Sequence, residues 1–316
     1  MGVIVDAMKK QTLVQWLLVG GALGVGLPSV AWAETTSLEL SPDTQAFANQ
    51  TLTQGPIRVV ARYEPIDSTA EPQQGNLQLQ LFYDNELKLS IGETVHLFGS
   101  VDLNDLDSDG TPELVVQAFT GGAHCCMAIT TYTWQDEAFT PIYFDYLDSG
   151  GGRFEDLDGD GLTEFITLDN AFFYAFSSYA GSAPPGLVLT FQDGRYVDTT
   201  QQFKGLTGEM AAALHEGIEA QTSVNSGEIN GLLAGYVAQN IRLGQYQEAW
   251  DLMLSHYDQA SDWGLEVYDS TGEVVEQYPD FPTALESFLT ELGYLEPSGV
   301  PQPGVDRAPV VRQRLH

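Results

Sequence analysis

The sequence predicts an α+β fold, in which an N-terminal antiparallel β domain is followed by a C-terminal helical domain. Between residues 35 and 203, short alternations of apolar and polar side chains are separated by turn-forming residues, which is typical of strands. Beyond residue 204, apolar residues recur at three- and four-residue spacing, which is typical of amphipathic helices. The predicted order is a signal peptide (1–33), the β domain (34–203), the helical domain (204–295) and a disordered tail (296–316).

The chain of 316 residues is strongly acidic. It has 44 Asp and Glu against 12 Lys and Arg, for a formal net charge of -32. Such a charge repels nucleic acids and anionic membrane surfaces, so we expect neither as a partner. The chain is also 43% hydrophobic and 11% aromatic, which is enough apolar material for a packed core. The expected partner of this acidic globular protein is another protein or a carbohydrate.

The first 33 residues have the organisation of a secretory signal peptide. Lys9 and Lys10 precede an apolar run at 13–27, and Ala31 and Ala33 form an A-x-A cleavage pattern. The run is shorter than the about 20 residues of a membrane span and is rich in glycine, which favours cleavage over the alternative of an uncleaved anchor. We therefore expect an exported protein, periplasmic or extracellular, with no membrane span after cleavage.

In the β domain, the clearest predicted strands are 57–63 and 77–83, where apolar and polar residues alternate strictly. The pattern resumes at 87–89 after a short turn, which predicts a hairpin. At 172–176 four of five residues are aromatic, and we expect alternate rings to be buried, with sugar or partner binding as the alternative. The strands expected in the rest of the domain are 95–98, 113–119, 128–134, 164–168 and 187–191.

Cys125 and Cys126 are the two cysteines of the chain, and they are adjacent. Consecutive Cα atoms lie about 3.8 Å apart, below the usual disulfide separation of about 4.4–6.8 Å, so a bond between them closes a strained eight-membered ring. Three alternatives are open: a vicinal disulfide, buried free thiols, or a soft-metal site with His124. In each case the core must stabilise the fold without a disulfide framework.

The helical domain is predicted from apolar stripes around 210–218, 229–241 and 246–257, and from a last helix at 283–292 that Pro282 precedes. The segment LGQYQEA at 243–249 resembles the start of the second helix of a tetratricopeptide hairpin, over about 228–258. No second copy follows at the 34-residue period of that family. The resemblance therefore implies a helix pair and not a peptide-binding groove.

A duplicated acidic segment is the most informative feature of the sequence. Residues 105–113 read DLDSDGTPE and residues 156–164 read DLDGDGLTE, so both follow the pattern D-x-D-x-D-G-x-x-E. Alternate carboxylates on a tight loop converge on one point, and oxygen ligands without His or Cys favour calcium. The expected ligands are Asp105, Asp107, Asp109, the Thr111 carbonyl and Glu113 in the first loop, and Asp156, Asp158, Asp160, the Leu162 carbonyl and Glu164 in the second.

These loops are not EF-hands, because Val116 and Thr167 stand at the twelfth positions, where an EF-hand has Glu, and strand patterns follow. Over about residues 100–200 the segment resembles the FG-GAP/VCBS repeats of calcium-binding β-propellers. The resemblance implies two Ca²⁺ ions, each in a loop that joins two strands of a blade. Residues 35–203 suffice for at most about four blades, so a partial propeller or a two-sheet sandwich is the alternative to a closed ring.

Catalytic motifs are sparse in this sequence. His215-Glu216 lacks the second His of a zinc-protease helix, and neither G-x-S-x-G nor S-x-x-K is present. The expected function is therefore that of an exported, non-catalytic calcium-binding protein whose β domain presents an interaction surface to a protein or glycan. The alternatives are a secreted hydrolase that acts on glycan or peptide, and an envelope inhibitor of a host hydrolase.

Overall fold

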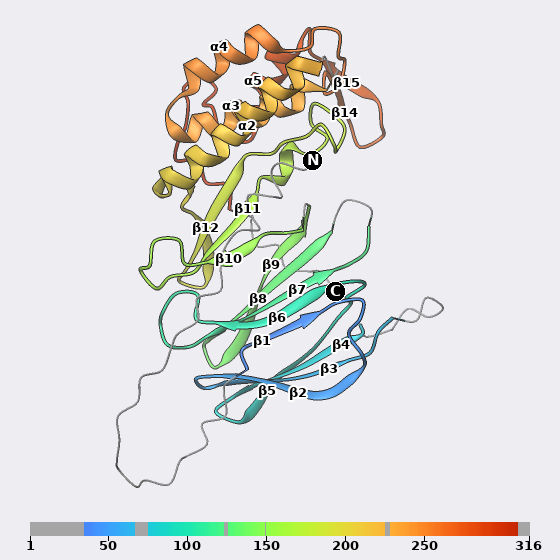
Figure 1. Ribbon diagram of the computed structural model, residues 1–316, viewed down its shortest axis with the longest axis vertical. Helices are drawn as coiled ribbons and strands as arrows, with labels where there is room; N and C mark the ends of the chain where they lie inside the picture. The colour runs from blue at the N-terminus through green and yellow to red at the C-terminus, as the bar shows by residue number, and fades with distance from the viewer. Residues whose placement is uncertain (1–34, 67–74, 123–125, 149, 225–227, 309–316) are drawn as a thin grey trace. The chain divides into compact units, whose positions relative to one another are not determined.

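A computed structural model describes residues 35–308, apart from 67–74, 123–125, 149 and 225–227 (Figure 1). These residues belong to one compact unit that begins at Thr35. The α+β prediction is confirmed, because antiparallel sheets come first along the chain and helices follow. Among the described residues, the strands form three sheets of four or five strands and one two-stranded hairpin, and no closed ring of blades.

The first sheet is a four-stranded antiparallel meander with the order β2-β3-β4-β5. Its central strands show why the sequence alternates there: Val59 pairs with Leu81 in the register, and both side chains are buried. Odd-numbered residues of both strands share the buried face because side chains alternate across a sheet. The four strands are β2 (Phe47–Gln54), β3 (Ile57–Tyr63), β4 (Leu77–Tyr83) and β5 (Glu86–Glu93).

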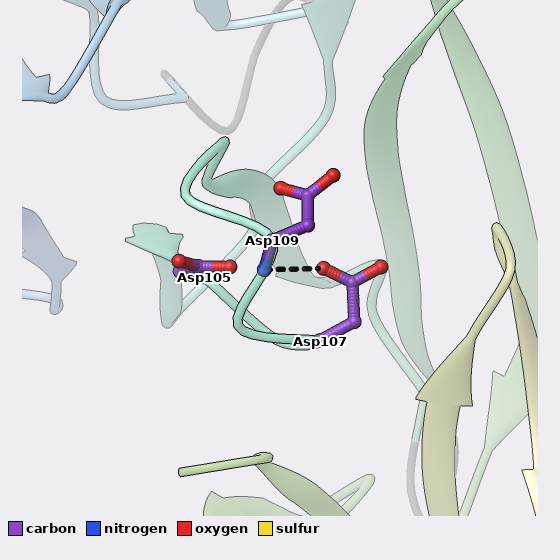
Figure 2. Close-up of side chains that lie close together, drawn as sticks. All are labelled: Asp105, Asp107 and Asp109. Atoms are coloured by element: carbon purple, nitrogen blue, oxygen red, sulfur yellow. Dashed lines mark hydrogen bonds between the residues drawn. The ribbon is translucent and has the colours of Figure 1, made fainter.

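The second sheet is covered on both faces. Leu114 and Val116 of β7 share a core with the first sheet, while Val115 between them shares a core with the third. The acidic loop of the first repeat joins β6 to β7 (Figure 2). The sheet has the order β1 (Ser37–Leu40), β6 (Gly99–Asn104), β7 (Glu113–Phe119), β8 (Met127–Gln135) and β9 (Ala138–Leu147).

The predicted strand at 95–98 is not formed, and β6 begins at Gly99 instead. The Asn76 side chain accepts from the Val95 N–H at 2.7 Å and donates to the Val95 carbonyl at 2.9 Å. A buried side-chain amide thus satisfies the backbone groups that a strand would pair with a neighbour.

The third sheet carries the second acidic loop, between β10 and β11. The predicted strand at 172–176 is wrong: a short 3₁₀ turn, η1 (Asn170–Phe172), leads into further turns, and Tyr174 has a φ of 62°. Phe172 and Phe176 are nonetheless buried, while Tyr174 is 51% exposed. The strands are β10 (Arg153–Glu155), β11 (Glu164–Leu168), β12 (Gly186–Gln192) and β13 (Arg195–Asp198), in that order.

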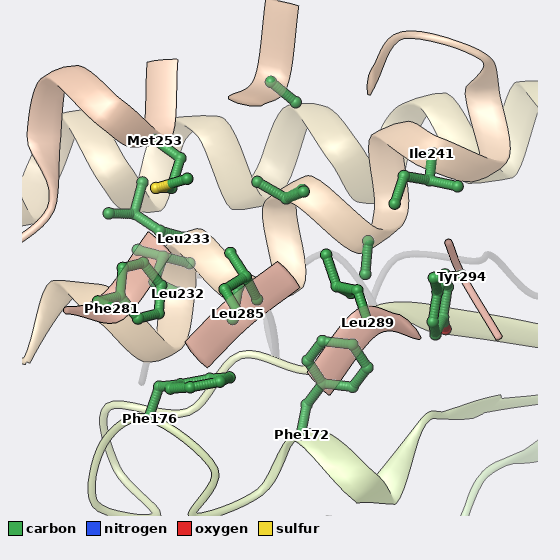
Figure 3. Close-up of a cluster of buried hydrophobic side chains, with 14 of the residues drawn as sticks. Phe172, Phe176, Leu232, Leu233, Ile241, Met253, Phe281, Leu285, Leu289 and Tyr294 are labelled. Atoms are coloured by element: carbon green, nitrogen blue, oxygen red, sulfur yellow. The ribbon is translucent and has the colours of Figure 1, made fainter. Parts of the chain in front are cut away.

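The helices pack around a core to which α3 contributes most of its length (Figure 3). Phe172 and Phe176 from the turns after the third sheet join this core, together with Leu233 of α3 and Leu285 of α5. Asp280 caps α5, because its carboxylate accepts from the Thr283 N–H at 3.0 Å. The elements are η2 (Thr200–Gln202), α2 (Lys204–Val224), α3 (Ile229–Leu243), α4 (Tyr246–His256), the hairpin β14 (Glu266–Tyr268) and β15 (Val274–Gln277), and α5 (Phe281–Glu291).

A buried charged network joins the third sheet, the helices and the C-terminal segment. Arg242 donates to Asp198 at 2.9 Å, and both side chains are 1% exposed. Arg307 donates to Asp169 at 2.8 Å, and the Tyr294 hydroxyl donates to the same carboxylate at 3.0 Å. The sequence predicts that the tail is disordered. The structure is instead ordered up to residue 308, because the Arg307 side chain in this tail forms an ion pair with the Asp169 carboxylate. Residues 309–316 lie outside the described residues.

Within the described ranges, no helix combines the length and the apolar character that a membrane crossing requires.

Candidate metal centres

The first acidic loop brings three aspartates together. Each of Asp105, Asp107 and Asp109 offers a carboxylate oxygen, and these oxygens lie within 4.8 Å of one another (Figure 2). The loop backbone orients the side chains: Asp105 accepts from the Gly110 N–H at 3.0 Å, Asp107 from the Asp109 N–H at 3.3 Å, and Asp109 from the Thr111 N–H at 2.6 Å. The arrangement leaves the remaining carboxylate oxygens available, and the three aspartates can hold a metal ion.

One oxygen of this loop has an unusual environment. Asp105 Oδ1 is buried and has no hydrogen-bond partner among the described residues. A buried carboxylate oxygen without a partner is costly, because it loses its hydration and gains nothing in return. Burial, followed by the charges of Asp109 and Asp105, raises the pKa of Asp107 although its backbone hydrogen bonds oppose this. A bound cation would remove both penalties, so the residues present fit a metal ion.

The second acidic loop repeats this geometry. Its three aspartates also bring one oxygen each within 4.8 Å of one another, and all three are exposed. Asp156 accepts from the Gly161 N–H at 3.2 Å, Asp158 from the Asp160 N–H at 3.2 Å, and Asp160 from the Leu162 N–H at 2.8 Å. These three bonds have the same donors and acceptors, position for position, as those of the first loop. The second group can also hold a metal ion.

The two glutamates of the pattern lie outside the aspartate groups. Glu113 accepts from the Leu106 N–H at 3.0 Å and from the Thr133 hydroxyl at 3.1 Å. Glu164 accepts from the Leu157 N–H at 3.0 Å, with the Thr190 hydroxyl at 3.5 Å. Both glutamates are 2% exposed. In this structure each one ties the start of its loop to a neighbouring strand, and its role as a metal ligand stays a prediction.

Burial has a large effect on the first of these glutamates. It raises the pKa of Glu113 to about 8, and the charges of Asp107 and Asp109 act in the same direction. The hydrogen bonds from Leu106 and Thr133 oppose the shift. The pKa of Glu164 is also raised, by burial first and then by the charges of its own three aspartates. Without a cation, the environment of each loop therefore shifts the pKa of its glutamate upward, and the larger of the two effects is at Glu113.

The predicted carbonyl ligands, Thr111 and Leu162, directly follow the loop glycines. Gly110 and Gly161 have φ angles of 89° and 93°, a region that residues with a side chain rarely adopt. The glycines thus allow the sharp turn that the sequence pattern predicts at the sixth position. The N–H groups of Thr111 and Leu162 close the loops, and the ligand role of their carbonyls stays a prediction.

The two loops contact each other, although 51 residues separate them. The Thr163 N–H donates to the Leu106 carbonyl at 3.0 Å, and the Ser108 hydroxyl donates to the Gly161 carbonyl. Asn104 and Thr163 add a longer side-chain bond of 3.4 Å. No sequence motif marks this contact. The contact follows from the packing of the sheets. Each loop joins two paired strands, and the second and third sheets share a core, which brings the loops together.

The predicted cysteine site falls partly outside the described residues. Cys125 and His124 are not described, so the vicinal disulfide stays a prediction. Cys126 precedes β8, and its carbonyl accepts from both the N–H and the hydroxyl of Thr120, each at 3.0 Å.

Comparison with known proteins finds similarity at the level of the sequence. A family model described as the sll0997 C-terminal domain matches residues 208–293, from the first turns of α2 to just beyond α5. The chain is 35% identical over 206 residues to a probable thylakoid lumen protein, sll0997, of Synechocystis sp. (strain ATCC 27184 / PCC 6803 / Kazusa). This alignment covers 62% of the chain and 60% of that protein.

The chain is also 30% identical over 192 residues to the uncharacterized protein y4bJ of Sinorhizobium fredii (strain NBRC 101917 / NGR234). That alignment covers 59% of the chain and 30% of the relative. The chain thus spans less than two thirds of the length of either relative. No solved structure matches the chain significantly.

Proposed function

We propose that this chain is an exported, non-catalytic protein that binds two Ca²⁺ ions, one in each acidic loop, and presents an interaction surface to a protein or carbohydrate. The observation that carries the calcium proposal is the matched pair of aspartate groups, in which one buried oxygen, Asp105 Oδ1, has no partner in the part of the chain that the structure describes. The ligands are oxygens alone, in loops of glycine-dependent shape, which favours calcium over zinc, copper or magnesium.

The proposed role of the ions is to stabilise the fold. Each ion neutralises carboxylates that otherwise repel one another beside a buried strand, and it releases the penalty on the unpaired Asp105 oxygen. Because the unfolded chain does not hold the ligands together, the free energy of calcium binding adds to the free energy of unfolding. The FG-GAP/VCBS resemblance belongs to this proposal, and the position of both loops between paired antiparallel strands supports it.

Export is supported by two independent observations. The first 33 residues have a signal-peptide pattern, and the Synechocystis relative is named a probable thylakoid lumen protein. Both imply translocation across a membrane, and we extend this to the present chain.

Thermal unfolding of the purified protein tests the calcium proposal. We expect the melting temperature to rise in about 1 mM calcium relative to excess chelator, and to rise less in magnesium. The matched control is the double variant Asp109→Asn with Asp160→Asn, which keeps the side-chain volumes and removes one carboxylate from each loop. Its melting temperature should respond little to calcium. A wild-type protein that melts at the same temperature in calcium and in chelator would contradict the proposal.

A further inference from the structure

The hairpin β14–β15 is exposed along its whole length. All of its residues are exposed, including the apolar side chains of Val267, Tyr268, Val274 and Val275. Within the described chain these two strands form a sheet of their own, with no third strand. An isolated two-stranded hairpin is marginally stable in water, and its outer edges carry unpaired backbone groups. A polypeptide partner that covers the hairpin would stabilise it.

The base of the hairpin is anchored firmly. Gly264 lies so close to the preceding turns that a Cβ atom there would be 2.2 Å from the Ala175 carbonyl. The Trp263 indole N–H donates to the Tyr174 carbonyl at 2.9 Å, which fixes the edge of the ring and leaves 42% of the residue exposed. Tyr174 is 51% exposed beside it. Fixed, exposed aromatic rings lose little entropy on binding and are typical anchors of protein interfaces.

Two adjoining surface hollows lie at this base. Gly264 and Glu266 line both, Tyr174 and Phe288 line one, and Trp263 and Tyr268 line the other. Each hollow is therefore lined by aromatic residues and by the Glu266 side chain. Cations bind well in such surroundings, because the ring faces and the carboxylate both attract positive charge.

The charge of the region points to the same kind of ligand. Residues 257–306 contain no Lys, Arg or His. A second copy of the chain would bring the same negative surface and be repelled, whereas a basic segment would be attracted. The acidic residues in this stretch are Asp258, Asp262, Glu266, Asp269, Glu273, Glu276, Asp280, Glu286, Glu291, Glu296 and Asp306.

We propose that this aromatic–acidic surface, formed by Tyr174, Asp262, Trp263, Glu266 and Tyr268, binds an extended basic segment of a partner polypeptide. The segment lies along the hairpin, where its backbone pairs with a free strand edge. Its Lys or Arg side chains contact Asp262 and Glu266 and stack on the rings of Trp263 and Tyr268. This inference deepens the proposed interaction role, and it rests on that role.

The test uses a fluorescein-labelled peptide of about 12 residues with alternating Lys and Val, which is basic and has a high strand propensity. Its binding to the purified protein is measured by fluorescence anisotropy at about 0.15 M salt, where long-range attraction is screened. We expect Trp263→Ala, and separately the pair Asp262→Asn with Glu266→Gln, to weaken binding about tenfold or more.

Matched variants separate this surface from the general negative charge. Phe98→Ala removes an aromatic residue of the same 42% exposure on another part of the chain. Asp136→Asn with Glu137→Gln removes two exposed charges in the turn between β8 and β9. Both controls should change the affinity less than about twofold. Trp263→Phe, which keeps a ring, should retain more affinity than Trp263→Ala and shows that the loss is not one of folding.

Three results would overturn the proposal. The wild type does not bind the peptide, the control variants weaken peptide binding as much as the surface variants do, or Trp263→Ala binds the peptide as tightly as the wild type. Binding of a tetramer of N-acetylglucosamine instead of the peptide, with loss in Trp263→Ala, would assign the surface to glycans and also overturn it. The peptide is titrated in calcium and in chelator. If the protein binds the peptide but calcium does not raise its melting temperature, the metal proposal alone is contradicted. If calcium raises the melting temperature but the protein does not bind the peptide, this inference alone is contradicted.

Discussion

The two acidic loops have the same nine-residue pattern and the same three backbone hydrogen bonds. They differ in the hydrogen bonding of one carboxylate oxygen of the first aspartate. Asp156 Oδ1 in the second loop accepts from the Gly159 N–H at 2.7 Å. The equivalent oxygen of the first loop, Asp105 Oδ1, is buried and has no hydrogen-bond partner within the described ranges. Two of the three aspartates of the first loop are also half-buried, whereas all three of the second are exposed. The same motif thus forms one loop in which this oxygen has a hydrogen-bond partner and one in which, among the described residues, it has none.

The fourth residue of the pattern also differs between the two loops. It is Gly159 in the second loop, where the N–H turns inward to the first aspartate, and Ser108 in the first, where the hydroxyl reaches outward to the Gly161 carbonyl of the other loop. The first loop therefore keeps an oxygen available in a site of lower dielectric constant, where attraction to a cation is stronger. We expect it to bind calcium more tightly than the second loop.

The largest expected difference between the loops is in their calcium-dependent stability. Asp109→Ala should lower the melting temperature in calcium by about 5–10 °C, the effect of losing a site that is saturated about a hundredfold above its Kd. Asp160→Ala should lower it by less, because the second loop is more exposed. In chelator both variants should melt within about 2 °C of the wild type. Equal decreases of the melting temperature in the two variants would contradict the proposed difference between the loops. No decrease in either variant would contradict both calcium sites.

A second difference concerns pH in the metal-free protein. Burial raises the pKa of Glu113 to about 8 in the folded state, whereas the ordinary pKa of a glutamate, which applies in the unfolded chain, is 4.5. This contribution to stability is present below about pH 4.5 and is lost as the pH rises toward 8, because only the folded state binds the proton in that window. Glu113→Gln cannot ionise, so it should lose less stability between pH 5 and pH 8, by on the order of 2 kcal/mol.

Chemical denaturation in chelator at several pH values measures this effect, and Glu164→Gln is the matched variant. Its effect should have the same sign, since the pKa of Glu164 is also raised. The same variants in calcium test the predicted ligands. If Glu113 binds the ion, Glu113→Gln should reduce the calcium-dependent rise in melting temperature. A wild-type protein that gains stability from pH 5 to pH 8 in chelator, with the glutamine variants unchanged, would show that Glu113 is ionised in the fold.

The smallest expected effect comes from exchanging the fourth residues. Ser108→Gly removes the hydrogen bond to the Gly161 carbonyl and allows the inward N–H geometry of the second loop, so it should weaken calcium binding in the first loop about two- to fivefold. Gly159→Ser should change the second loop in the opposite direction. Calcium titration of both variants checks this. An affinity that increases in Ser108→Gly would mean that the fourth residue does not set the difference.

The sequence predicted the features that depend on short-range pattern. Strict alternation at 57–63 and 77–83 matches β3 and β4, and the helical stripes match α3 and α4. The aspartates of each loop converge as their spacing predicts. These features follow from periods of two and 3.6 residues and from turn geometry, all of which are local.

The features that the sequence did not predict depend on long-range contacts. The strand expected at 95–98 gives way to backbone bonds from Asn76, and the tail is held by Asp169, which lies 138 residues before Arg307. The hairpin β14–β15 is too short and too exposed to have a periodic signal. The unpaired oxygen of Asp105 likewise arises from burial, which a loop sequence alone does not specify.

Calorimetric titration of calcium into the metal-free protein, with wild type and Asp105→Asn in parallel, tests the central claim most directly. The wild type should bind two ions per chain with unequal affinities. Asp105→Asn, which replaces the unpaired carboxylate by an amide of the same size, should lose the tighter site and keep the weaker one. A wild type that binds no calcium, or two sites of equal affinity that Asp105→Asn leaves unchanged, would contradict the account.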